Sequence, residues 1–207
     1  MYINVLEQLG VTDVANHGLH IETSKEWNDE VFRFYKSQGV MPRDKIIGFN
    51  IGSAVPVKRW PAERFADVAD YFGNKGYKTV FFGGPMDLDM VKPVVEQMKT
   101  SPIVATGAFK LGPLAAAMKW CDLLITNDSG PMHVAISQGV PIVALYGPSN
   151  PFFYGPYQAK SIVLESMDQY EICKNMKQVM KEGKYKGISI NTEEQVIKAA
   201  ETLLQEA

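Results

Sequence analysis

From residue 45 onward, the sequence alternates short, unbroken apolar segments with longer segments whose apolar residues recur at helical spacing. A strand that is buried on both faces is apolar at every position, whereas a half-exposed strand alternates. Parallel strands need a crossover connection, which is usually a helix. The alternation therefore predicts an α/β domain with a doubly wound parallel sheet. The expected strands are 45–51, 78–82, 103–106, 122–126 and 140–146, with 161–165 as a last strand.

The segments on either side of this alternation differ from it. Residues 1–44 hold two expected helices, one ending at Gly10 and one over 23–39. We interpret these residues as an interdomain linker and helical lead-in, because no strand accompanies them. Residues 45–190 form the predicted ligand-binding domain, and residues 191–207 a C-terminal helix.

Three local elements are expected after the last long apolar segment. The proline- and glycine-rich stretch 147–157 is typical of an ordered surface loop. A helix is also expected over 167–181. Thr192 and Gln195 have the spacing of a capping box, which predicts where the final helix begins.

Composition excludes several classes of protein. Hydrophobic residues make up 46% and charged residues 21%, which are values of an ordinary globular chain. The net charge of −2, from 21 basic and 23 acidic residues, argues against a nucleic-acid surface. Cys121 and Cys173 fit neither a zinc motif nor a disulfide framework, so a reducing cytoplasm is expected. No apolar stretch approaches the roughly 20 residues that span a bilayer.

The loops that follow the expected strands are the candidates for ligand binding. In an open parallel sheet, ligands bind outside the carboxyl ends of the strands. The first of these loops lacks GxGxxG, and no GxxxxGK[ST] occurs in the chain. A dinucleotide fingerprint and a P-loop are therefore both absent, which disfavours a NAD-dependent dehydrogenase.

The first loop, GSAVPVKRW, contains the first group of candidate residues. Gly52 and Ser53 follow the strand, and Lys58 precedes a helix expected to begin at Pro61. A helix N-terminus combined with a lysine favours a diphosphate. The alternative is that Lys58 and Arg59 are merely solvated, as most basic residues in loops are.

The second group is the string NDSGPMH, which follows the strand at 122–126. It places Asp128, Ser129 and Gly130 at the strand end and His133 in the next helix. A carboxylate there would repel a phosphate, so a sugar hydroxyl is its expected partner. The alternatives are that Asp128 caps the helix and that His133 is a packed, hydrogen-bonded side chain.

Two further candidates lie after the second and third strands. Asp87 could accept hydrogen bonds from a ribose, or could cap the following helix. Phe109 could stack on a base, or could plug the sheet edge. No group of residues has metal-ligand spacing, and GxSxG is absent.

Taken in order, these loops resemble glycosyltransferase family 9, the ADP-heptose:lipopolysaccharide heptosyltransferases. The matching strings are IGFNIGSAVPVKRWPAERFADVADYF, TVFFGGPMD and CDLLITNDSGPMHVAISQGVPIVALYGPSNP, and more weakly EEQVIKAAETLL. The resemblance covers about 45–157 well. It implies that this chain is the second, Rossmann-like half of a GT-B enzyme, whose first domain carries the acceptor surface and a general base. Nothing before Lys45 is long enough for that domain, so we expect a donor-binding part that does not itself catalyse transfer.

The resemblance also implies roles for single residues. Ser53 and Lys58 would contact the donor diphosphate, with Lys58 stabilising the leaving phosphate. Asp128 would hold sugar hydroxyls. Position 87, or Met86 if the alignment shifts by one residue, would lie near the adenosine. The remaining donor contacts implied are Gly52, Phe109, Ser129, Gly130 and His133.

The reaction implied is inverting and independent of metals, and it needs no cofactor because the ADP-sugar is itself a substrate. The expected partners are the nucleotide-sugar donor and, through the other domain, the lipopolysaccharide core. The expected location is the cytoplasm, with peripheral contact at the inner membrane. Two alternatives remain: another GT-B transferase or epimerase that uses a UDP-sugar, and a non-catalytic nucleotide-binding module.

Overall fold

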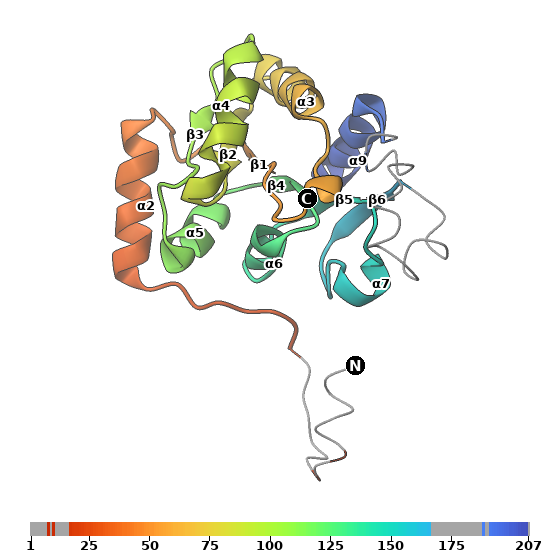
Figure 1. Ribbon diagram of the computed structural model, residues 1–207. Coiled ribbons are helices and arrows are strands. Elements are labelled where there is room, and N and C mark those ends of the chain that lie inside the picture. The colour runs from red at the N-terminus through yellow and green to blue at the C-terminus, as the bar shows by residue number, and fades with distance from the viewer. Residues whose placement is uncertain (1–7, 9, 11–16, 167–187, 189–190, 207) are drawn as a thin grey trace.

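The computed structural model describes residues 8, 10, 17–166, 188 and 191–206. Its centre is a six-stranded sheet in the order β3-β2-β1-β4-β5-β6, in which every neighbouring pair is parallel (Figure 1). The predicted parallel α/β sheet is thereby confirmed. The strands are β1 (Ile46–Asn50), β2 (Lys78–Phe82), β3 (Ile103–Val104), β4 (Leu123–Asn127), β5 (Ile142–Tyr146) and β6 (Ser161–Glu165).

The sheet has two halves that meet between β1 and β4, with β1, β2 and β3 in one half and β4, β5 and β6 in the other. Gly48 of β1 pairs with Val80 of β2 on one side and with Leu124 of β4 on the other. The chain winds outward from β1 to β3, then returns to the middle and winds outward again from β4 to β6. Such a reversal opens a crevice at the carboxyl ends of the two central strands, where ligands bind in this kind of fold.

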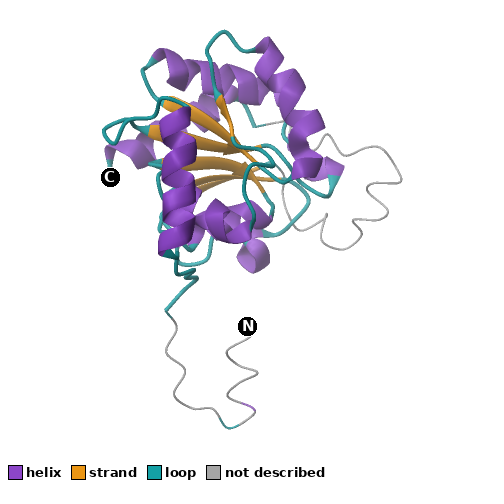
Figure 2. Ribbon diagram, turned by 90° about the vertical axis from the view of Figure 1, so that its left-hand side faces the viewer, coloured by secondary structure: helices purple, strands orange, loops and turns teal. Residues whose placement is uncertain are grey.

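Helices cover both faces of the sheet, so that the strands form the middle of three layers (Figure 2). One core joins the sheet to α2, α5 and α6, and the other joins it to α3, α4 and α9. All described helices are too short to cross a membrane. Their bounds are α2 (Lys25–Ser37), α3 (Ala62–Asn74), α4 (Leu88–Gln97), α5 (Leu111–Met118), α6 (Gly130–Ile136), α7 (Pro151–Tyr154) and α9 (Glu193–Gln205), with 3-10 turns η1 (Pro56–Lys58) and η2 (Pro85–Asp87).

Helix α2, which the sequence places in the lead-in, packs against α5. Val31 and Tyr35 are fully buried, and the Tyr35 hydroxyl donates to the carbonyl oxygen of Ala117 at 3.0 Å. The Trp27 ring lies so close to Gly112 that an added Cβ would be 2.5 Å from it. Burial of such side chains contributes about 1.5–3 kcal/mol each. The second lead-in helix is thus part of the same core as the sheet.

Several expected elements differ in detail from those of the structure. The helix after the first loop begins at Ala62, with Pro61 as its N-cap, rather than at Pro61. Helix α5 begins at Leu111, before the expected start near Pro113. The expected loop over 147–157 contains the single helical turn α7, because Asn150 caps it by accepting from the Phe152 amide.

Other expectations are confirmed or lie beyond the description. The capping box of α9 is confirmed, since Thr192 and Gln195 exchange hydrogen bonds of 2.8 and 3.3 Å. The helix expected over 167–181 lies outside the described residues, as do all but residues 8 and 10 of the helix expected to end at Gly10.

Candidate functional site

The loop after β1 is fastened to the end of β4 by buried amide side chains. Asn50 is fully buried and donates to Thr126 Oγ1 at 3.0 Å and to Ser129 Oγ at 2.6 Å. Asn127 donates to the carbonyl oxygen of Ile51 at 2.8 Å and accepts from the Trp60 amide at 3.0 Å. The first loop is therefore held at both of its ends by β4.

The far end of the same loop is anchored by Trp60, which is 2% exposed. Its indole nitrogen donates to the carbonyl oxygen of Asn191, and its ring packs edge-on against Phe65. Arg59 folds back and donates to the carbonyl oxygen of Ser53 at 2.8 Å. These contacts fix the backbone of η1, which carries Lys58.

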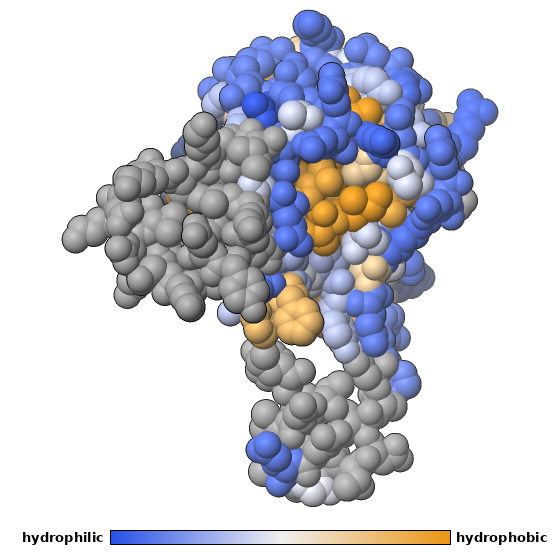
Figure 3. All heavy atoms as spheres, turned by 90° about the vertical axis from the view of Figure 1, so that its right-hand side faces the viewer, coloured by the Kyte–Doolittle hydropathy of each residue, from blue (hydrophilic) through white to orange (hydrophobic). Residues whose placement is uncertain are grey.

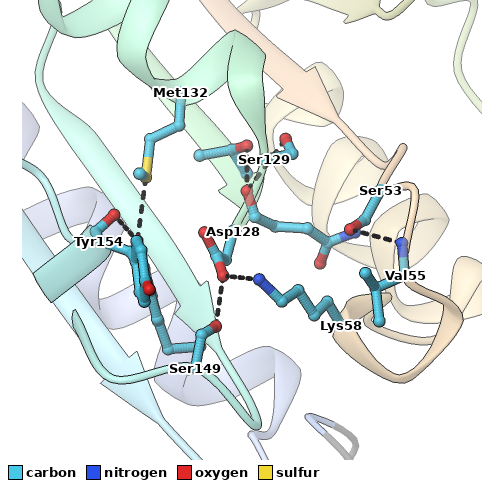
Figure 4. Close-up of polar contacts among 11 residues, drawn as sticks. Ser53, Val55, Lys58, Asp128, Ser129, Met132, Ser149 and Tyr154 are labelled. Atoms are coloured by element: carbon cyan, nitrogen blue, oxygen red, sulfur yellow. Dashed lines mark hydrogen bonds and ion pairs between the residues drawn. The ribbon is translucent and has the colours of Figure 1, made fainter.

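Three loops meet on one buried carboxylate at the carboxyl edge of the sheet (Figure 4). Lys58 Nζ lies 2.5 Å from Asp128 Oδ2, and the side chains of Lys58 and Asp128 are 18% and 7% exposed. The hydroxyl of Ser149, from the loop after β5, donates to the same oxygen. Lys58 is thus a paired and largely buried cation, which contradicts the reading in which it is a solvated loop residue.

The start of α6 does not need Asp128 as a cap. Ser129 occupies the N-cap position without a side-chain capping bond, and its hydroxyl instead accepts from Asn50. The alternative in which Asp128 stabilises this helix start is therefore wrong. Gly130 is exposed, and an added Cβ would meet no atom within 4 Å. The surface above this turn is open.

Two titratable side chains flank the carboxylate. His133 on α6 is half-buried, and burial lowers its pKa although the negative charge of Asp128 acts in the opposite direction. Burial, together with the charge of Asp128, raises the pKa of the Tyr146 phenol, whose hydroxyl donates to the carbonyl oxygen of Tyr154 at 2.6 Å. At neutral pH the site therefore presents a neutral imidazole and a protonated phenol.

Asp87 follows β2, the neighbour of β1 in the same half of the sheet, and lies against the first loop. Its carboxylate accepts from the Gly84 amide at 2.8 Å and so caps η2. The same carboxylate lies so close to Gly52 that an added Cβ would be 2.4 Å from Oδ1. Position 52 therefore has no room for a side chain. The carboxylate thus caps the 3-10 turn η2 and not α4, where Asp87 is the N-cap residue without a side-chain capping bond. Its ribose contact stays a prediction, and Met86 beside it is 92% exposed.

Ser53 and Phe109 are both held by contacts within the chain. Ser53 is 8% exposed, and its hydroxyl accepts from the Val55 amide at 3.4 Å. The Phe109 ring packs edge-on against Phe34 of α2 with 4.9 Å between ring centroids. Phe109 therefore packs against α2 at the margin of the core, and both a role at the sheet edge and a contact with a base stay predictions.

Comparison with known proteins adds a family assignment to this geometry. The family model described as glycosyltransferase family 9 (heptosyltransferase) matches residues 2–185. The chain belongs to glycosyltransferase family 9.

Solved and curated family members agree with this assignment. A family 9 glycosyl transferase from Veillonella parvula DSM 2008 is 75% identical, with a TM-score of 0.94, over 100% of this chain and 59% of that one. The ADP-heptose lps heptosyltransferase II of E. coli is 26% identical, with a TM-score of 0.75, over 90% and 54%. Lipopolysaccharide heptosyltransferase 2 of Salmonella typhimurium is 31% identical over 166 residues, covering 78% of this chain and 47% of the relative. The chain thus spans about half the length of the curated relative.

Within this family 9 chain, the structure brings together the first-loop and NDSGPMH candidates and adds residues that sequence reasoning missed. Ser149 was missed because it lies in a proline-rich turn. Asn50 and Asn127 were missed because each ends an otherwise apolar segment, although a polar residue at that position is a usable signal. Asn50 Oδ1 is buried without a partner among the described residues. No cluster of three potential metal ligands occurs in the described part of the chain.

Proposed function

We propose that this chain binds the ADP-sugar donor of a heptosyltransferase and supplies the donor half of the transfer reaction. The observation that carries the proposal is the contact of 2.5 Å between Lys58 and Asp128. A cation suited to a diphosphate and a carboxylate suited to sugar hydroxyls lie side by side where a doubly wound sheet binds its ligand. The heptosyltransferase named for ADP-heptose, at 26% identity, supports this choice of donor.

In the proposed complex Lys58 turns from Asp128 to the diphosphate. Its side chain is flexible, and a phosphate oxygen is a strong acceptor for an ammonium group. Asp128 then accepts hydrogen bonds from hydroxyls of the sugar. Ser53, Gly52 and the open turn at Gly130 lie along the same edge and complete the cradle.

The adenosine would extend toward β2 and β3, where Asp87 and Phe109 lie. Asp87 would accept a hydrogen bond from a ribose hydroxyl with Oδ1, the carboxylate oxygen that is not bonded to the Gly84 amide. Phe109 would contribute its exposed edge to the adenine pocket, because its ring is only half-buried. His133 would stay neutral and serve as a hydrogen-bonding group beside the sugar.

The proposed chemistry is an inverting displacement. An acceptor hydroxyl gives its proton to the general base, and its oxygen forms a bond to the anomeric carbon as the bond from that carbon to the diphosphate breaks, so that ADP leaves. Negative charge grows on the departing phosphate, so a lysine placed there stabilises the transition state. Loss of one such preorganised group typically raises a barrier by about 2.7–4 kcal/mol. The proposal assigns no metal or cofactor, because Lys58 supplies the positive charge.

The acceptor side of the proposal rests on the relatives. The lipopolysaccharide heptosyltransferase 2 that this chain matches is about twice as long as the match. We assign binding of the lipopolysaccharide core, and the general base, to the part of such relatives that this chain does not match. Because lipopolysaccharide is anchored in a membrane, the proposal includes peripheral contact with the cytoplasmic face of the inner membrane. The UDP-sugar and non-catalytic alternatives are not favoured by these comparisons.

Calorimetric titration of the chain with ADP and with UDP tests the proposal. The two nucleotides share the diphosphate and differ in the base, so they separate an ADP-sugar site from a UDP-sugar site. We expect ADP to bind more tightly. Tighter binding of UDP would contradict the heptosyltransferase proposal, and absence of binding by both would contradict a nucleotide site altogether.

A further inference from the structure

Ser149 has a buried side chain in a loop that is held by hydrogen bonds on both sides. It lies between β5 and α7 and is 5% exposed. On its C-terminal side Asn150 caps α7 by accepting from the Phe152 amide at 2.8 Å. On its N-terminal side the Tyr146 hydroxyl donates to the carbonyl oxygen of Tyr154 at 2.6 Å. The loop is therefore closed on itself across α7, and Ser149 has a fixed position.

Ser149 and Lys58 contact the same oxygen of Asp128, but they differ in mobility. The lysine reaches the carboxylate with a long side chain that has many rotamers, whereas the serine oxygen moves through the single χ1 torsion. A ligand with a diphosphate can draw Lys58 away from the carboxylate. Ser149 is uncharged, and its oxygen can leave the carboxylate only through a change of χ1 or of the loop backbone.

We propose that Ser149 is a positioning residue that holds the Asp128 carboxylate toward the donor sugar once Lys58 has transferred to the diphosphate. The inference rests on the proposed function and adds a residue to it. Asp128 is buried, and a buried carboxylate that loses its counter-ion requires a remaining hydrogen-bond donor. Of the two side chains bonded to Asp128 Oδ2, Ser149 is the one that stays in place, and the buried Tyr146 phenol also interacts with the carboxylate.

The role of Ser149 predicts an effect on the sugar and not on the nucleotide. Asp128 contacts the sugar in the proposed complex, so a disordered carboxylate weakens ADP-heptose binding and leaves ADP binding unchanged. A merely structural serine would weaken both ligands together or neither of them. The ratio of the two dissociation constants therefore separates the two roles.

The experiment is calorimetric titration of Ser149→Ala with ADP and with ADP-heptose. We expect binding of ADP-heptose to weaken about tenfold, as for a hydrogen bond to a charged group, and that of ADP to change less than about twofold. Ser149→Thr keeps the hydroxyl and should restore binding of ADP-heptose. Ser137→Ala is the matched control, because Ser137 is equally buried and its hydroxyl donates to the Val134 carbonyl at 2.6 Å, away from Asp128.

Other results would overturn the inference. An unchanged ratio of the dissociation constants in Ser149→Ala contradicts it, as does failure of Ser149→Thr to restore binding. If Ser149→Ala does not fold, Ser149→Cys keeps nearly the same shape with a weak donor and must show the same selective loss. The proposed function fails separately, through loss of ADP binding by the unaltered chain or an unchanged ADP affinity in Lys58→Ala.

Discussion

Asp70 and Asp128 are two carboxylates of similar burial, with exposed fractions of 8% and 7%, in different parts of the domain. Asp70 on α3 accepts from the amides of Lys99 and Thr100 at 2.8 Å and from the Thr100 hydroxyl at 2.6 Å. These bonds use both of its oxygens. Asp128 accepts at Oδ2 from the side chains of Lys58 and Ser149, and the Tyr146 phenol also interacts with its carboxylate.

The comparison teaches which buried charge is available to a ligand. Backbone amides cannot leave Asp70 unless the segment before β3 moves, so this carboxylate ties α3 to that segment. Burial alone would raise the pKa of Asp70, but the hydrogen bonds from Thr100 and Lys99 hold it below its ordinary value. Asp128 instead has a lysine that can leave without any backbone change. Similar burial therefore accompanies a structural role in one case and an exchangeable site in the other.

The largest expected effect is on ADP binding when Lys58, the partner of Asp128, is replaced. Lys58→Ala removes the cation proposed for the diphosphate, and we expect ADP to bind about 100-fold more weakly, or about 2.7 kcal/mol. Calorimetry measures the change. Lys75→Ala is the control, because Lys75 also pairs with a carboxylate, that of Glu201 at 2.5 Å, but lies on the surface. Equal losses of ADP affinity in Lys58→Ala and Lys75→Ala would contradict a specific contact between Lys58 and the diphosphate.

Replacing Asp70 should lower the stability of the folded chain. Asp70→Asn leaves an amide group facing two backbone donors, so we expect the free energy of unfolding to fall by about 2 kcal/mol. Urea denaturation measures this loss. Binding of ADP and of ADP-heptose to the folded protein should be unchanged, and a selective loss of either ligand would show that Asp70 is not merely structural.

Asp128→Asn should show the reverse pattern. We expect ADP-heptose to bind about tenfold more weakly, while the free energy of unfolding changes by less than about 1 kcal/mol, because Lys58 can reach solvent when its partner is neutral. Titration and urea denaturation of the same sample give both quantities. A large loss of stability with unchanged binding would assign Asp128 to the same class as Asp70.

The smallest expected effect is on the pH dependence of stability. Burial lowers the pKa of His133 in the folded chain, so the unfolded chain binds a proton more readily. Stability should therefore fall as pH decreases below about 6.5, the ordinary value for histidine, and His133→Gln should reduce that fall. Denaturation at a series of pH values checks the slope. An unchanged slope in His133→Gln would show that burial of His133 does not contribute.

Much of the fold followed from local pattern in the sequence. The apolar runs that became β1, β2, β4 and β5 are buried on both faces, so they carry the signal of a covered parallel sheet without interruption. Ends of helices were less certain, because Leu111 has no capping side chain before it. The turn α7 was missed because it is stabilised by Asn150 rather than by hydrophobic spacing.

The candidate site was predictable as a set of loops but not as a set of contacts. Sheet topology alone places Lys58 and Asp128 at neighbouring strand ends, and the sequence predicts both. Their pairing depends on how η1 is anchored through Trp60 and Asn127, which are distant in the sequence. The hydrogen bond from Ser149 to the same carboxylate depends on the conformation of its loop, which the proline and glycine residues of the sequence do not determine.

A crystal structure of the chain with ADP bound tests the central claim most directly, because it shows where the Lys58 ammonium lies when a diphosphate is present. The account predicts ADP at the carboxyl ends of β1 and β4, with Lys58 Nζ within hydrogen-bond distance of a phosphate oxygen and Ser149 still bonded to Asp128. ADP bound at another edge, or bound here with Lys58 still on Asp128, would contradict it.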